Sequence, residues 1–157
     1  MLIKNLIDED FVNYKKPSMF IAFPYCNWKC EREAGCSLCQ NSSLANEPNI
    51  NIDSVDLVKR YLDNPITQAI VCGGLEPFDS FSELRGLVLR LRAFTDDDIV
   101  IYTGYTEIEL DHVLPFFKSF KNVIIKFGRF KPNQEPHYDE LLGVKLASDN
   151  QYARRIS

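Results

Sequence analysis

The sequence predicts an α/β protein, built either as a partial (β/α) barrel or as an open, curved and mainly parallel sheet. Short apolar runs alternate along the chain with amphipathic segments of helical period, which is the pattern of βαβ units. The chain has 157 residues. A full eight-unit barrel usually needs about 250 residues, so a closed barrel is not expected. We expect one domain, residues 1–157, large enough to bury a core of its own.

The first half of the chain contains two expected strands, a long loop and a helix. Leu2 to Ile7 predicts a short first strand, and Met19 to Phe23 has the length and aromatic content of a buried strand. An irregular segment then continues to Pro48, and loops of this length in compact domains tend to be functional. Asp53 or Ser54 can cap the helix that follows, which Asn64-Pro65 ends.

The second half alternates strands and helices more regularly. Thr106 and Glu109 have the spacing of a capping box, which predicts a helix from there to about Phe117. The other expected elements are a strand at Ala69–Cys72, a helix at Phe81–Ala93, strands at Asp98–Tyr102 and Asn122–Lys126, and a last strand near Tyr152–Ile156.

Four unusual loops follow the carboxyl ends of the expected strands. In parallel α/β architectures that edge of the sheet is where ligands bind. We therefore expect these loops to form a single site. They are the segment from Cys26 to Cys39, Gly73-Gly74-Leu75-Glu76-Pro77, Thr103-Gly104-Tyr105 and Gly128-Arg129.

Four of the five cysteines fall within the first of these loops, with the spacing Cys26-x3-Cys30-x5-Cys36-x2-Cys39. Thiolates packed this densely after a strand are usually metal ligands in a reducing compartment. Four thiolates are sufficient for a closed tetrahedral zinc site. Three of them could instead hold an iron–sulfur cluster with one iron left open for a substrate. The isolated Cys72 is expected to be a small buried apolar residue.

Composition and charge argue against several partners. The net charge is −4 with a pI near 5.2, and no long Lys/Arg run occurs. Neither nucleic acid nor an anionic membrane is therefore expected as a partner. No stretch approaches the roughly 20 apolar residues of a membrane span, and the acidic residues 8–10 disfavour a signal peptide. We expect a cytoplasmic protein.

At this point the residues resemble a known family, the radical S-adenosylmethionine (SAM) superfamily. Cys26-x3-Cys30 and Cys36-x2-Cys39 resemble the two halves of its Cys-x3-Cys-x2-Cys motif, separated by an insertion. The segment from Gly73 to Pro77 resembles its Gly-Gly-Glu-Pro strand end, which holds the methionine amino group of SAM, although Leu75 is an extra residue within it.

Within the superfamily the chain is similar to the activating enzyme of anaerobic (class III) ribonucleotide reductase. The similar stretches are Tyr102–Thr106, Gly128-Arg129-Phe130 and the ending from Gly143 to Ile156. The resemblance implies a [4Fe–4S] cluster that reductively cleaves SAM to a 5′-deoxyadenosyl radical, which generates a glycyl radical on the large subunit of the reductase. It also implies a flavodoxin- or ferredoxin-type electron donor.

The same resemblance assigns roles to particular residues. Cys26, Cys30 and Cys39 would hold the cluster, with Cys36 in place of Cys30 in a second alignment. No side chain is assigned a catalytic role beyond the cluster and SAM. Leu38 stands where an aromatic residue that packs on the adenine is common. The residues expected to bind SAM are Asn41, Gly73, Gly74, Glu76, Pro77 and Thr103.

Two alternatives remain open at this stage. The chain could carry out another radical SAM reaction on a peptide or protein, which would change only the partner. It could also be a four-cysteine zinc-binding interaction module and no enzyme. The zinc module predicts a colourless protein, in which Gly73-Gly74 and Glu76 have no ligand to bind.

Overall fold

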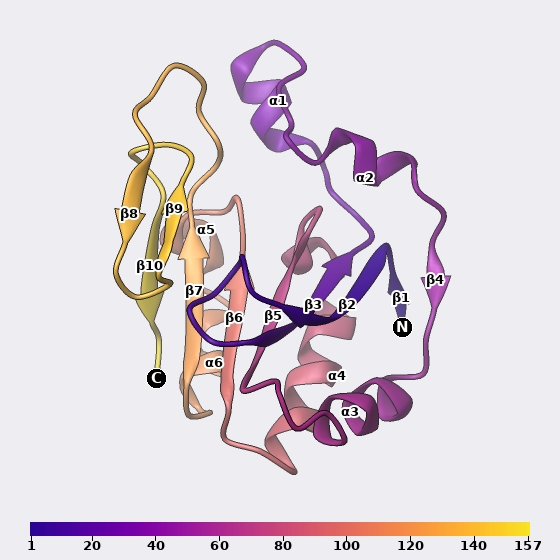
Figure 1. Ribbon diagram of the computed structural model, residues 1–157. Coiled ribbons are helices and arrows are strands. Elements are labelled where there is room, and N and C mark those ends of the chain that lie inside the picture. Colours follow the sequence, from indigo (N-terminus) through magenta and orange to yellow (C-terminus); the bar gives the residue numbers. More distant parts are fainter.

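Six strands form the central sheet of the computed structural model, which describes residues 1–157 (Figure 1). Their order across the sheet is β10-β7-β6-β5-β3-β2. β3, β5, β6 and β7 are parallel, whereas β2 and β10 are antiparallel to their neighbours at the two edges. The bounds are β2 Asn5–Asp10, β3 Ser18–Phe23, β5 Ala69–Gly74, β6 Asp98–Tyr102, β7 Val123–Phe127 and β10 Tyr152–Arg155. The α/β class and the mainly parallel sheet are confirmed; the sheet is open, and the structure shows no closed barrel.

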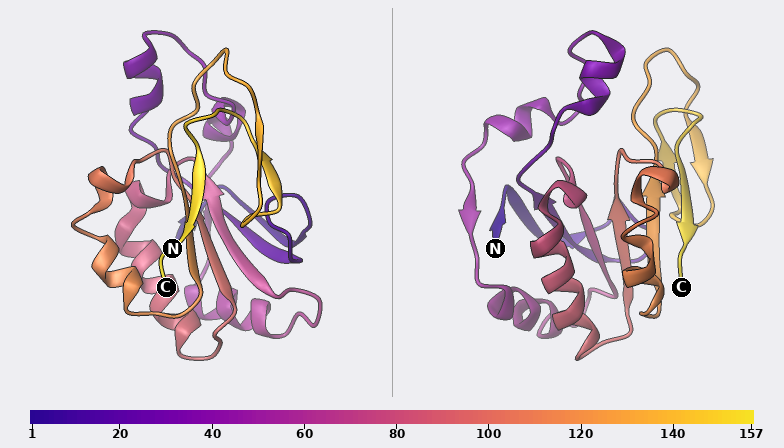
Figure 2. Two further views of the ribbon diagram at one scale, coloured as in Figure 1. Left: turned by 90° about the vertical axis from the view of Figure 1, so that its left-hand side faces the viewer. Right: turned by 180° about the vertical axis from the view of Figure 1, so that it is seen from behind.

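Four helices and a 3-10 turn cover one face of the sheet (Figure 2). They are α3 (Ser54–Leu62), the 3-10 turn η1 (Pro77–Ser80), α4 (Phe81–Arg92), α5 (Glu107–Leu110) and α6 (Leu114–Lys118). Asp53 caps α3 by accepting the Val55 N–H at 2.7 Å, as expected. The single helix expected from Thr106 to Phe117 is wrong, because the chain leaves the helix after Leu110 and starts again at Leu114. Pro115 opens the first turn of α6, the position where proline is tolerated because it lacks an N–H.

Short elements complete the fold, and several were not expected. The strand expected from Leu2 to Ile7 is split in two. β1 (Leu2–Ile3) pairs with β4 (Ile50–Asn51), whereas residues 5–7 belong to β2, which joins the main sheet and continues to Asp10. The long loop contains two short helices, α1 (Lys29–Ala34) and α2 (Ser42–Asn46). β8 (His137–Asp139) and β9 (Val144–Leu146) form a hairpin in the polar tail. No helix in the structure is both long and apolar enough to cross a membrane.

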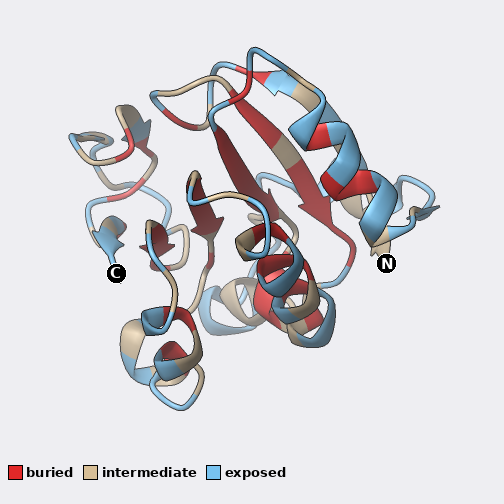
Figure 3. Cartoon of the chain, turned by 90° about the horizontal axis from the view of Figure 1, so that it is seen from below, coloured by how far each residue is buried: buried red, intermediate tan, exposed pale blue.

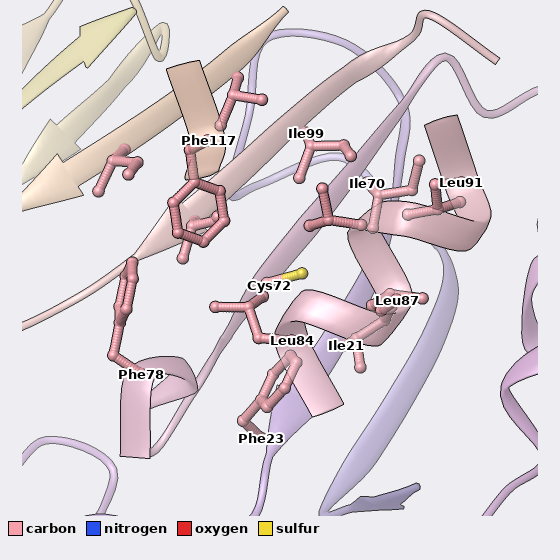
Figure 4. Packing of buried hydrophobic residues seen from close by; sticks show 14 of the residues in the cluster. Ile21, Phe23, Ile70, Cys72, Phe78, Leu84, Leu87, Leu91, Ile99 and Phe117 are labelled. Carbon is pink, nitrogen blue, oxygen red and sulfur yellow. The ribbon is translucent and has the colours of Figure 1, made fainter. Parts of the chain in front are cut away.

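The main core lies between the sheet and the helices (Figure 4). Strand side chains such as Ile70 and Ile99 pack there against Leu84, Leu87 and Phe117 from the helices. Cys72 is fully buried in this core, as predicted. Figure 3 shows the central strands buried while the helices expose their outer sides.

The opposite face of the sheet is covered less completely. A smaller cluster there contains Tyr14 from the β2–β3 loop together with Leu142 and Leu146 from the hairpin region. These segments cover part of the face, and the carboxyl ends of the parallel strands remain beside the cysteine segment, residues 26–41 (Figure 1). The fold thus leaves a hollow at the strand edge where the sequence predicts a site.

Candidate functional site

A pocket of about 540 Å³ lies at the carboxyl edge of the parallel strands. Its walls come from the cysteine segment, from the ends of β5, β6 and β7, and from β9. Eight of the residues predicted to bind the cluster or SAM line it: Cys26, Cys30, Cys39, Asn41, Gly73, Gly74, Glu76 and Thr103. The structure thus brings together segments that are far apart in the sequence.

Two of the predicted residues do not line the pocket. Cys36 is exposed and lies outside the lining residues, whereas the other three loop cysteines are partly buried within it. Pro77 is buried at the start of η1, where it shapes the turn after β5. The geometry therefore separates Cys36 from Cys26, Cys30 and Cys39.

The thiols of the cysteine segment are not gathered into a ready-made metal site. No group of three histidine, cysteine, aspartate or glutamate side chains is gathered tightly enough to hold a metal ion. Burial raises the pKa of Cys26 to about 11, and the neighbouring Cys30 adds to that rise. Burial also raises the pKa of Cys39, again with a contribution from Cys30. Both thiols therefore hold their protons at neutral pH, and binding a metal would release those protons.

The donor set nevertheless fits a thiolate-bound cluster. The Trp28 N–H donates to Cys26 Sγ at 3.2 Å, and the Asn41 N–H donates to Cys39 Sγ at 3.4 Å. Hydrogen bonds to sulfur favour the charged thiolate and are one of the means by which proteins tune cluster potentials. Three partly buried thiols at one pocket wall, two of them with such donors, match the needs of an iron–sulfur cluster.

Polar contacts anchor the start of the cysteine segment to the strand ends. The Asn27 N–H donates to Asp79 Oδ2 at 2.7 Å, and the Asn27 amide donates to the Tyr105 hydroxyl at 2.6 Å. Tyr105 in turn donates to Asp79 Oδ1 at 2.6 Å. Burial, followed by Asp79, raises the pKa of Tyr105, so the phenol stays a donor at neutral pH. These bonds fix the backbone next to Cys26.

A second anchor is a network of ion pairs around Glu109. Arg129 binds its carboxylate with both terminal nitrogens, at 2.9 and 2.7 Å, and Lys29 contacts the same group. Arg129 Nε also lies 3.4 Å from Glu33. The hydrogen bonds from Arg129 and Lys29 hold the pKa of Glu109 far below its usual range. The network ties α1 to α5 and to the loop after β7.

The two glycines that end β5 allow the neighbouring strand β3 to approach closely. Gly74 has φ +89°, and a Cβ there would lie 2.7 Å from Ala22 Cα. A Cβ on Gly73 would lie 2.9 Å from the Phe20 ring. Only glycine adopts the positive φ of position 74 without strain. The Asn41 amide donates to the Gly74 carbonyl at 2.8 Å, which joins the cysteine segment to this strand end.

Glu76, directly before η1, belongs to the strand-end wall, the part of the pocket formed by the ends of β5, β6 and β7 and the loops after them. Its carboxylate accepts the Thr103 hydroxyl at 2.8 Å and the N–H groups of Phe78 and Gly104 at 3.1 and 2.9 Å. The residue is only 6% exposed, and burial raises its pKa to about 7. The contact to Thr103 joins two residues that the resemblance assigned to SAM. Three donors therefore hold one acceptor group in a fixed orientation at the pocket wall.

Sequence reasoning missed one buried cation in this pocket. Lys126, at the end of β7, is buried, and its ammonium donates to the Gly128 carbonyl at 2.8 Å. Burial lowers its pKa to about 8. The available signal was a lysine inside the apolar run from Val123 to Phe127, since lysine is almost never fully buried without a specific partner.

Comparison with known protein families agrees with this site. The family model of the 4Fe-4S single cluster domain matches residues 17–151, a range that includes all five cysteines and every strand-end loop described above. This domain is found in proteins of the radical SAM type. No curated protein and no solved structure matches the chain. Since the match covers most of the sequence, the protein belongs to the 4Fe-4S single cluster domain family, and its cysteine segment is expected to bind an iron–sulfur cluster.

Proposed function

We propose that the protein is a radical SAM enzyme whose cluster is held by Cys26, Cys30 and Cys39. The observation that carries the proposal is that these three cysteines line one pocket with Gly73-Gly74 and Glu76, while Cys36 lies outside it. Three protein ligands on a four-iron cluster leave one iron free for a substrate, which four ligands would not. The family match favours iron–sulfur over the zinc module.

The chain's own residues would bind and orient SAM. Glu76 is a fixed acceptor that suits the methionine ammonium, and it holds Thr103 and the Gly104 N–H in place through its other bonds. Gly73 and Gly74 also line the pocket, and they present only backbone to it. Cys26, Cys30 and Cys39 would hold the cluster, which would supply the electron for reductive cleavage of SAM, chemistry that belongs to the cofactor.

The proposed target is a glycine of a larger enzyme, an anaerobic ribonucleotide reductase, with a flavodoxin- or ferredoxin-type protein as electron donor. The support is that each of the three stretches resembling the reductase activases contributes to the same pocket. The lining residues are 102–105 of Tyr102–Thr106, all of Gly128–Phe130, and 145–147 and 151 of the ending from Gly143 to Ile156. Another radical SAM reaction on a peptide or protein would use the same residues and differ in its partner. The two are separated by adding the reductase and looking for a glycyl radical signal.

The decisive experiment is anaerobic iron and sulfide analysis, followed by EPR of the reduced protein with and without SAM. We expect about four irons per chain and a reduced-cluster signal that changes when SAM is added. Methionine and 5′-deoxyadenosine should then form in equal amounts under reducing conditions. Zinc without iron after reconstitution would contradict the proposal, and so would a cluster whose spectrum ignores SAM.

A further inference from the structure

The insertion that splits the cysteine motif makes a folded excursion. Eight residues, 31 to 38, separate Cys30 from Cys39. The chain continues past Cys30 in α1, which ends at Gly35 with φ +68°, and the Gly35 N–H donates to the Glu31 carbonyl at 2.9 Å. Cys36 lies exposed beyond this turn, and Leu38 is again at the pocket wall.

One side chain joins the start of this excursion to its end. Glu31 directly follows Cys30, and its Oε1 accepts the N–H of Cys39 at 3.0 Å and that of Leu38 at 3.1 Å. The same oxygen accepts the Ser37 hydroxyl at 3.2 Å. Three donors from consecutive residues therefore converge on one oxygen, seven to nine positions along the chain from Cys30.

These contacts matter because nothing else in the excursion supplies a core. α1 contains no buried residue, so apolar packing does not fix the position of Cys39 relative to Cys30. A longer loop has more conformations to lose when its ends are brought together. The Glu31 contacts bring the ends together locally, and they act on the backbone of Cys39 itself.

We propose that Glu31 is a positioning residue that closes the insertion and so returns Cys39 to the cluster site. The excursion from Glu31 to Leu38 then acts in space like the short spacer of an uninterrupted motif. This inference rests on the proposed assignment of Cys30 and Cys39 as cluster ligands. It also gives the insertion a role that leaves Cys36 free of the cluster.

The test compares Glu31→Gln, Glu31→Asp and Glu31→Ala in the full chain, reconstituted anaerobically with iron and sulfide. Glutamine keeps an oxygen at Oε1, whereas aspartate keeps the charge but withdraws that oxygen by one methylene. Loss of groups that orient metal ligands typically changes metal affinity by about 10–100-fold. We expect Glu31→Asp and Glu31→Ala to lose iron to a chelator about tenfold faster than wild type, and Glu31→Gln to behave like wild type. Exposed Glu47, at the end of α2, provides the matched control Glu47→Ala.

If Glu31→Asp loses iron to the chelator no faster than wild type, the proposal is overturned. It is also overturned if Glu31→Gln loses iron as fast as Glu31→Ala. Urea unfolding of each iron-free variant shows that the fold is intact, and the Gln–Asp pair remains informative if Glu31→Ala is misfolded. A wild-type protein that takes up no iron would overturn this inference together with the proposed function. A wild-type cluster that ignores SAM would contradict only the proposed function, because the chelator comparison needs no SAM.

Discussion

The two walls of the pocket are built on different physical principles. The strand-end wall rests on β3, β5, β6 and β7, most of whose residues are buried, in the two apolar clusters on either face of the sheet. The opposite wall, residues 26–46, is the cysteine wall, and its two helices, α1 and α2, contain no buried residue at all. That wall is attached to the rest of the protein through hydrogen bonds and ion pairs, among them those of Asn27, Asn41 and Glu109.

The difference indicates what each wall contributes to function. Apolar burial fixes the strand-end wall in the folded protein, so the Gly73-Gly74 turn and Glu76 are in place before any ligand binds. Exposed polar contacts contribute little individually, so a bound cluster would contribute much of the order of the cysteine wall, since binding energy at a metal site is also folding energy. Damage to the first wall should change global stability, and damage to the second should change metal binding.

The largest expected effect is on iron content, from single cysteine substitutions. Cys30→Ala should abolish the four-iron cluster, because it removes one of the three thiols at the pocket wall. Cys36→Ala should retain it, because that thiol is exposed outside the pocket. Iron, sulfide and the EPR signal of each reconstituted variant provide the measurement. Loss of the cluster from Cys36→Ala with retention in Cys30→Ala would reverse the ligand assignment.

A glycine pair tests the rigidity of the strand-end wall. Gly74→Ala places a methyl group 2.7 Å from Ala22 Cα at a positive φ, which should lower the free energy of unfolding by about 2–5 kcal/mol. Gly86 lies in the middle of α4, where an added Cβ would meet open space. Gly86→Ala should therefore raise the free energy of unfolding by about 0.5–1 kcal/mol. Urea unfolding of the two iron-free variants measures both changes. Equal free energies of unfolding for Gly74→Ala and wild type would show that the backbone of this wall adjusts to the added methyl group at little cost.

These two walls also differ in how far the sequence could predict them. The strand ends were predicted well, because apolar runs such as Ile70 to Cys72 and the glycines after them are local signals with one structural solution. The capping box at Thr106 was confirmed for the same reason. The path of the cysteine segment could not be predicted, since it depends on pairings such as Lys29 with Glu109, 80 residues apart. The β8–β9 hairpin was missed because each of its strands has only 3 residues, too few to show a period.

The pH dependence of stability tests whether Glu76 is as deeply enclosed as its contacts indicate. Its pKa rises from 4.5 to about 7 on folding because of burial, so between these values the folded state holds more protons than the unfolded chain. Raising the pH through this window should therefore lower the free energy of unfolding, by at most about 3 kcal/mol, and the change from Glu76 should be nearly complete by about pH 8. Urea unfolding between pH 5 and 8 measures the slope.

Glu76→Gln provides the comparison for this slope, because it removes the titrating group and keeps an oxygen for the Thr103 hydroxyl. The variant should show a flatter profile over the same window, whatever its absolute stability. The thiol of Cys26, with its pKa raised to about 11, titrates well above it. An unchanged slope in Glu76→Gln would assign the pH dependence to other groups and leave Glu76 more accessible to water than its burial implies.

The smallest expected change in global stability comes from the cysteine wall. Lys29→Ala removes the ammonium that contacts Glu109 and lies 3.8 Å from Glu33. Because exposed ion pairs contribute about 0–1 kcal/mol, urea unfolding should shift little, while limited proteolysis of the iron-free protein should cleave residues 29–46 faster. Lys121→Ala, which breaks the exposed pair with Asp96, is the matched control and should leave that cleavage unchanged. If Lys29→Ala instead destabilised the protein as much as Gly74→Ala, the cysteine wall would belong to the cooperative core, and the two walls would not differ as described.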